Sequence, residues 1–150
     1  MPQSFARIII HVVYSTKNWE PVLTQSIRRD LYTYTAGILN TLDCLPLAVG
    51  GTSNHVHVLA QMSRTITAAK MVEDMKRGSS RWLKTRGAGF QGFSWQSGYG
   101  AFSVSQSRLQ IVKQYISNQE EHHRKTTFQE EFLRLLKKHG IAYDEKYVEG

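Results

Sequence analysis

The first half of the chain alternates between continuous apolar runs and amphipathic segments. Residues 5–15 (FARIIIHVVYS) are β-branched and apolar without a break, which predicts a buried central strand. Over residues 24–42 the apolar positions recur at steps of three and four, which predicts an amphipathic helix with Thr24 as its N-cap. Two short strands follow, at residues 45–51 and 54–62, with a Gly-Gly turn after the first.

The second half continues with a helix, a strand and two more helices. Residues 66–85 place apolar side chains on one stripe, which predicts a helix, and residues 94–105 resume a strand pattern. Ser107 and Gln110 have the spacing of a capping box and predict a helix from 107 to about 121. Thr127 and Glu130 repeat that signal before a last helix, which a C′ glycine at Gly140 closes.

The predicted order is βαββαβ with two helices appended, within one domain of residues 1–150. A split βαβ arrangement of this kind is a ferredoxin-like α+β fold, an antiparallel sheet with helices on one face, to which the C-terminal helices are added. The lone cysteine, Cys44, excludes an intramolecular disulfide framework. With neither a secretory leader nor an apolar run of membrane-spanning length in the sequence, we expect a cytoplasmic protein.

The net charge of +7 indicates a polyanionic partner, with nucleic acid preferred over membrane. Seven basic residues fall between Ser63 and Phe90, against only two acidic ones, Glu73 and Asp74. A solvated helix face would produce the same pattern, so charge alone does not decide the function.

The sequence His55-Val56-His57 carries the first candidate chemistry. On a strand, alternate side chains share a face, so both imidazoles point the same way while Val56 points into the core. Imidazoles spaced about 7 Å apart along a strand are able to converge on one metal ion. Ordinary hydrogen-bonded histidines would give the same short pattern.

Tyr115 and Gln119 form the second candidate group. They are four residues apart and therefore share one face of the predicted helix at 107–121. A boundary tyrosine that only packs its ring is the usual interpretation of such a residue.

The two groups together supply the parts of one reaction. A phenol with a pKa near 10 is a weak nucleophile unless its target is made electrophilic, which a divalent cation does by polarising a phosphoryl oxygen. Two imidazoles and an amide oxygen form a mixed nitrogen and oxygen site that suits Mg²⁺ or Mn²⁺.

These residues resemble the single-tyrosine HUH transposases of the IS200/IS605 type. The likeness lies in His55-Val56-His57, in Tyr115 with Gln119 on a late helix, and in the segments 98–105 (GYGAFSVS) and 118–123 (NQEEHH). It extends over essentially the whole chain.

The resemblance implies an enzyme that cuts and rejoins single-stranded DNA at the ends of a mobile element. Tyr115 would attack and form a 5′-phosphotyrosine, and His55, His57 and Gln119 would hold the divalent metal, with His122 as the second choice for the third ligand. It also implies DNA hairpins as partners and a homodimer, in which Tyr115 of one subunit completes the site of the other. The candidates for phosphate contacts on the basic helix are Lys76, Arg77, Arg81 and Lys84.

Three other interpretations compete. A histidine-triad nucleotide hydrolase would need a third histidine where Leu59 stands. A non-catalytic module for single-stranded nucleic acid would need exposed aromatic residues on its sheet, a signature that the strands lack. A domesticated, repeat-associated tyrosine transposase would keep the same chemistry and serve the host.

Overall fold

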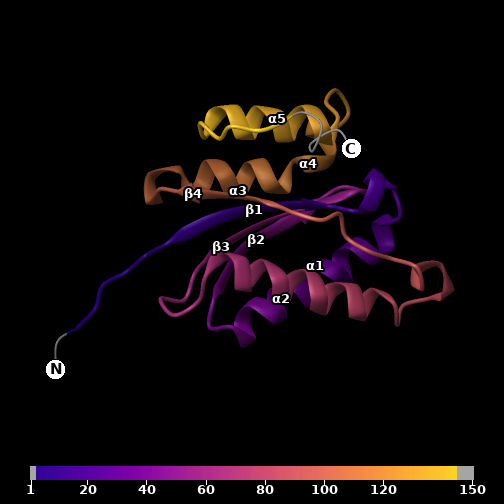
Figure 1. Ribbon diagram of the computed structural model, residues 1–150, viewed down its shortest axis with the longest axis horizontal. Coiled ribbons are helices and arrows are strands. Elements are labelled where there is room, and N and C mark those ends of the chain that lie inside the picture. Colours follow the sequence, from indigo (N-terminus) through magenta and orange to yellow (C-terminus); the bar gives the residue numbers. More distant parts are fainter. Residues whose placement is uncertain (1–2, 145–150) are drawn as a thin grey trace.

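A computed structural model describes residues 3–144 as one four-stranded antiparallel sheet with helices on both faces (Figure 1). The strands lie in the order β2-β3-β1-β4. The elements in chain order are β1 (Ile9–Ser15), α1 (Gln25–Thr41), β2 (Leu45–Gly51), β3 (His55–Gln61), α2 (Ala68–Leu83), β4 (Gly100–Val104), α3 (Leu109–Ser117), α4 (Gln119–His122) and α5 (Phe128–Lys138). This order and topology confirm the predicted ferredoxin-like fold.

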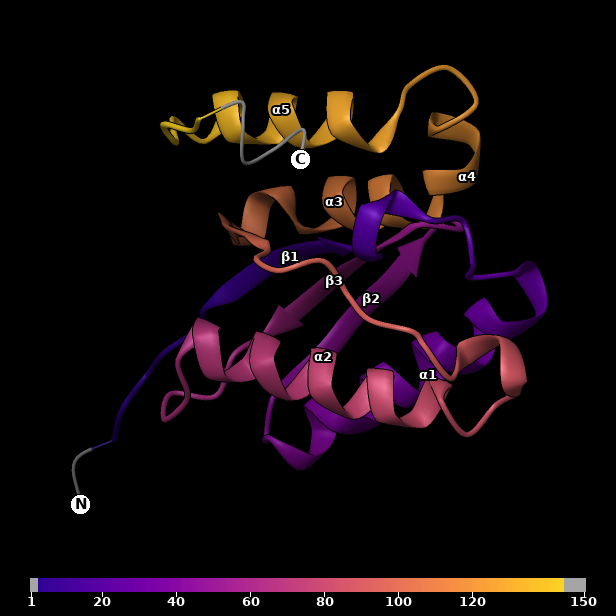
Figure 2. The ribbon, with the colours of Figure 1, turned by 45° about the vertical axis from the view of Figure 1, so that its right-hand side comes forward.

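The sheet separates two groups of helices. Figures 1 and 2 show α1 and α2 on one side of the sheet, and α3, α4 and α5 on the other. Alternation along β1 sends Val12 and Tyr14 into the core beneath α1 and α2, while Val13 packs with Phe102 and Phe128 under α5. The α3 helix covers β2 and β3, where Ile116 packs on Leu59. The sheet is therefore buried on both faces, which explains the unbroken apolar run of β1.

Two predicted strands are shorter in the structure. The first begins at Ile9 and not at residue 5, because the antiparallel pairing with β3 starts at Ile9 opposite Gln61 and Phe5 is 87% exposed. The fourth spans Gly100–Val104 and not residues 94–105. Its predicted first half leaves the sheet after one isolated bridge between Thr16 and Trp95, and Trp95 packs its ring against Tyr14.

The predicted helix at 107–121 is two helices, and its predicted capping box is wrong. Ser107 lies in a 3-10 turn, Gln106–Arg108, and its hydroxyl pairs with Ser105 at 3.0 Å. The helical path then breaks at Asn118, between α3 and α4. Such a break changes the direction in which the following side chains point, and Gln119, the first residue of α4, is buried.

The ends of α5 follow the sequence signals. Thr127 and Glu130 form the predicted capping box. At the other end Gly140 has φ of 66°, and the amides of Gly140 and Ile141 donate to the carbonyls of Lys137 and Leu136, which is a Schellman motif. Within residues 3–144, no helix has the length and apolar character needed to cross a membrane.

Candidate active site

The two strand histidines lie side by side on the face covered by the C-terminal helices. His55 and His57 are both 0% exposed, and their ring centroids are 5.1 Å apart. Val56 and Val58 point to the opposite face and join the core beneath α1 and α2. The strand alternation therefore places the two imidazoles together, as the sequence predicts.

Each strand histidine is held from behind through its Nδ1 atom. His55 Nδ1 lies 2.8 Å from Asn54 Oδ1, and His57 Nδ1 lies 2.8 Å from His11 Nε2. Burial lowers the pKa of His55 to about 4, so its imidazole is neutral at physiological pH. Because an amide oxygen only accepts, Nδ1 of His55 donates to Asn54, and Nε2 presents a lone pair to the centre of the site.

A glutamate from α5 occupies that centre, and the sequence patterns did not predict it. The Oε1 atom of Glu131 lies 3.0 Å from His57 Nε2, 3.4 Å from His55 Nε2 and 3.1 Å from His123 Nε2. Burial raises the pKa of the Glu131 carboxyl, but the surrounding imidazoles of His123, His55 and His57 lower it by more, and the net pKa lies below its ordinary value. Glu131 is therefore an ionised carboxylate in a buried place.

The second carboxylate oxygen of Glu131 faces the candidate nucleophile. The Tyr115 hydroxyl donates to Oε2, and Gln119 Nε2 donates to the same atom at 3.0 Å. The Tyr115 ring lies edge-on to His57, with centroids 5.7 Å apart. Burial raises the pKa of Tyr115, and the adjacent Glu131 carboxylate raises it further, so the hydroxyl keeps its proton at neutral pH.

Two more histidines lie near the same carboxylate, His122 at the end of α4 and His123 directly after it. His122 Nε2 is 3.5 Å from Glu131 Oε2, and this side chain is 28% exposed. His123 is more buried, and its Nδ1 donates to the Thr126 carbonyl at 2.6 Å. Its Nε2 lies 3.1 Å from Glu131 Oε1, so a further imidazole nitrogen points to this oxygen. Of this pair the sequence singled out His122, whereas the structure sets His123 closer to His55, with ring centroids 4.5 Å apart.

The donor atoms of this site suit a cation. His55, His57 and Glu131 offer ligand atoms within 4.8 Å of one another, and so do His122, His123 and Glu131. Gln119 Oε1 lies 2.9 Å from His55 Nε2, so a further acceptor faces the same lone pair. Acceptor atoms that face one another without a donor repel, and a divalent cation among them would turn this repulsion into attraction. The residues present therefore fit a bound metal ion.

The predicted basic residues lie away from these side chains. Lys76, Arg77 and Arg81 belong to α2 and Lys84 follows its last residue. Figure 2 shows α2 on the opposite side of the sheet from α3, the helix that carries Tyr115. Lys76 donates to the carbonyls of Gln96 and Gly98 at 2.7 and 2.8 Å, and Arg77 pairs with Glu73 on its own helix. Arg81 and Lys84 are exposed.

Two of the missed residues left a signal in the sequence. Glu131 is an acidic residue on the apolar stripe of α5, three positions after Phe128 and four before Leu135. His11 is a polar residue in an otherwise apolar strand. Residues of those types at such positions are costly to bury without partners, and this cost is the signal.

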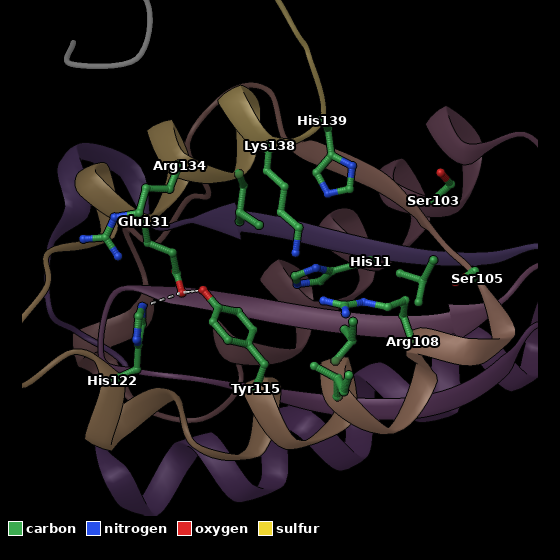
Figure 3. A pocket seen from close by; sticks show the side chains of 14 residues that line it. His11, Ser103, Ser105, Arg108, Tyr115, His122, Glu131, Arg134, Lys138 and His139 are labelled. Carbon is green, nitrogen blue, oxygen red and sulfur yellow. Dashed lines mark hydrogen bonds and ion pairs between the residues drawn. The ribbon is translucent and has the colours of Figure 1, made fainter.

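A cavity of about 500 Å³ opens beside Tyr115, between α3 and α5 (Figure 3). Tyr115, His122 and Glu131 form the wall shared with the histidine site, and His11 lies at the base. The cavity is therefore adjacent to the nucleophile candidate.

Comparisons with known proteins agree in sequence and in fold. Residues 4–119 match a family described as IS200-like transposase. A candidate transposase from Deinococcus radiodurans R1 superposes with a TM-score of 0.62 and 20% identity, covering 79% of this chain and 98% of that one. A REP-associated tyrosine transposase, solved bound to a REP hairpin, superposes with a TM-score of 0.61 and 10% identity, covering 82% of this chain and 73% of that one. No curated protein sequence matches the chain.

Proposed function

Since the chain belongs to the IS200-like transposase family, we propose that it cuts and rejoins single-stranded DNA with Tyr115 as the nucleophile. The observation that carries this proposal is the hydrogen bond from the Tyr115 hydroxyl to Glu131, beside two buried histidines. Most side-chain hydrogen bonds in proteins are made to water or to the backbone, so a tyrosine hydroxyl bound to a buried carboxylate is unusual. Without a cation the carboxylate keeps the phenol protonated, and a divalent cation beside it would favour the phenolate and so activate the nucleophile.

The proposed step balances around the scissile phosphate. The Tyr115 oxygen forms a bond to phosphorus, and the bond from phosphorus to the 3′-oxygen breaks with its electron pair on that oxygen. The phenol proton passes to Glu131 Oε2, the nearest acceptor, and the leaving 3′-oxygen takes a proton from water. A 5′-phosphotyrosine and a free 3′-hydroxyl result, and reversal of the step rejoins strands because the phosphodiester energy is kept in the linkage.

His55, His57 and Gln119 would hold a divalent cation, Mg²⁺ or Mn²⁺, together with Glu131 Oε1 and His123. When bound, such an ion polarises a phosphoryl oxygen and neutralises charge that develops there. The larger share of imidazole donors favours Mn²⁺ over Mg²⁺, because Mg²⁺ prefers an all-oxygen shell. His11 is a positioning residue in this scheme, because it fixes the ring of His57 through Nδ1.

DNA hairpins are the proposed partners, since a fold neighbour was solved with a REP hairpin. Arg81 and Lys84 are the proposed phosphate contacts on α2, because both are exposed. Lys76 and Arg77 remain candidates, although each has partners within the protein. A domesticated relative of the mobile-element enzymes would use the same residues.

The test is the covalent intermediate itself. The chain is incubated with single strands that carry a hairpin and flanking sequence, with Mn²⁺ or Mg²⁺, and the products are separated on a denaturing gel. We expect a protein–DNA band that survives denaturation, requires the metal and is absent with a blunt duplex. Cleavage that yields only free DNA ends would contradict the tyrosine mechanism.

We further propose a homodimer whose two sites each form within one chain. Tyr115 contacts the histidines of its own chain, and α3 lies so close to β2 that a Cβ on Gly50 would be 2.5 Å from the Ile116 carbonyl oxygen. Removing α3 from its own sheet would expose this packed face. This replaces the shared arrangement that the family resemblance implies.

Mixing two inactive variants distinguishes these arrangements. Tyr115→Phe chains are combined with His57→Ala chains, and differently tagged copies first establish that heterodimers form. We expect no cleavage from the mixture, because every site within one chain then lacks one essential group. Recovery of about a quarter or more of the wild-type rate, from the one complete site that a shared arrangement assembles, would overturn the proposal.

A further inference from the structure

The cavity between α3 and α5 has two kinds of wall. Apolar side chains come from both helices, namely Ile111 and Val112 from α3 and Leu135 from α5. Ile111 is 52% exposed, which is high for an isoleucine beside a candidate catalytic residue. A volume of about 500 Å³ is in the range of pockets that enclose one small molecule. The space is large enough for one unpaired base.

Two cations extend into this cavity. Figure 3 shows the side chains of Arg108 and Lys138 reaching toward His11 from different walls. Within residues 3–144, neither side chain has a carboxylate at ion-pair distance. Glu131 also lines the cavity, but its oxygens are taken by histidines, Gln119 and Tyr115. The accessible part of the cavity is therefore positively charged.

We propose that this cavity binds the unpaired nucleotide adjacent to the scissile phosphate. Arg108 and Lys138 hold the phosphate of that nucleotide, and its base lies against Ile111, Val112 and Leu135. This inference rests on the proposed function, because Tyr115 forms one wall of the cavity. It assigns the contacts with the reacting strand to α3 and α5, on the opposite side of the sheet from the basic helix α2.

The chemistry of the walls identifies the occupant. When a strand presents a phosphate to the Tyr115 hydroxyl, the neighbouring nucleotide lies beside Tyr115. The cavity is at this place, because Tyr115 forms one of its walls. Cationic side chains neutralise phosphate, and apolar walls accept a base whatever its identity. Contacts to the phosphate fix the register of the strand relative to Tyr115.

The experiment measures binding in the Tyr115→Phe background, so that no chemistry is required. Single strands carry one neutral methylphosphonate in place of a phosphate, moved one position at a time past the cleavage site. Arg108→Gln and Lys138→Gln are compared with Lys113→Gln, which lies on α3 but does not line the cavity. We expect each cavity variant to weaken binding about tenfold at low salt and to flatten the log K against log salt slope by about 0.7.

The decisive outcome is coupling between protein and DNA. At one phosphate next to the cut, the methylphosphonate should abolish the difference between Lys138→Gln and the unchanged residue, whereas other positions leave it intact. An abasic nucleotide at that position should weaken binding about tenfold. Both cations are exposed, so neither substitution is expected to unfold the protein. Thermal unfolding of each variant verifies this.

Two results would overturn the subsite: equal effects of the cavity variants at every methylphosphonate position, or no effect beyond that of Lys113→Gln. The proposed function is tested separately by the covalent band. Coupling without a covalent band in the protein that keeps Tyr115 would retain the subsite and reject the nucleophile. A covalent band without coupling would retain Tyr115 as the nucleophile and reject the subsite.

Discussion

Tyr115→Phe is expected to abolish the covalent protein–DNA intermediate and to lower strand cleavage by on the order of 1000-fold or more. Only the hydroxyl oxygen of this residue is able to form a bond to phosphorus, and the substitution removes that atom alone. The ring and its packing against His57 and His122 remain. The effect should therefore fall on the chemical step and leave substrate binding nearly unchanged.

The Tyr115→Phe protein should stay folded. The substitution removes one hydrogen bond to the charged Glu131 Oε2, worth about 1.5–3 kcal/mol, while Gln119 Nε2 still donates to that oxygen. Hairpin affinity within threefold of the unchanged protein is expected, and fluorescence anisotropy measures it. A control substitution at the exposed Tyr99, Tyr99→Phe, should leave the covalent band intact. Cleavage by Tyr115→Phe within tenfold of the unchanged protein would remove Tyr115 from its role.

His57→Ala is expected to eliminate metal binding and metal-dependent cleavage together. Losing an outer partner of a metal ligand typically costs about 10–100-fold in affinity, and loss of a direct donor costs at least as much. His57 is fully buried, and its Nε2 lies 3.0 Å from Glu131 Oε1. The substitution therefore also leaves Glu131 with one imidazole fewer around a buried charge, and some loss of thermal stability is expected.

Metal-dependent stabilisation gives a readout that needs no substrate. An ion present at 100 times its dissociation constant stabilises the folded state by about 2.7 kcal/mol. Thermal unfolding should thus show a rise of several degrees with Mn²⁺ for the unchanged protein, and none for His57→Ala or His55→Ala. His139→Ala is the matched control, because this histidine stacks on Phe102 and is outside the donor set. Full cleavage by the His57 variant in EDTA would refute the metal site.

The local patterns of the sequence were sufficient for the architecture and for two parts of the site. Periods of two and of three to four residues identified the four strands and the helices α1 and α2. They did so because the face that an element buries determines which of its own positions are apolar. The same alternation placed His55 and His57 together. Element ends were less well predicted where partners decide them, as at Ile9, where pairing with β3 begins.

The tertiary structure decided what surrounds those residues. His57 and Glu131 are 74 positions apart in the chain, and only the packing of α5 over the sheet brings them to 3.0 Å. The break at Asn118 buries Gln119, and the pairing of β1 with β3 sets His11 beside His57. A sequence pattern reports which face of its own element a residue occupies. It contains no information on which other element covers that face, and the convergence of side chains from several elements depends on that packing.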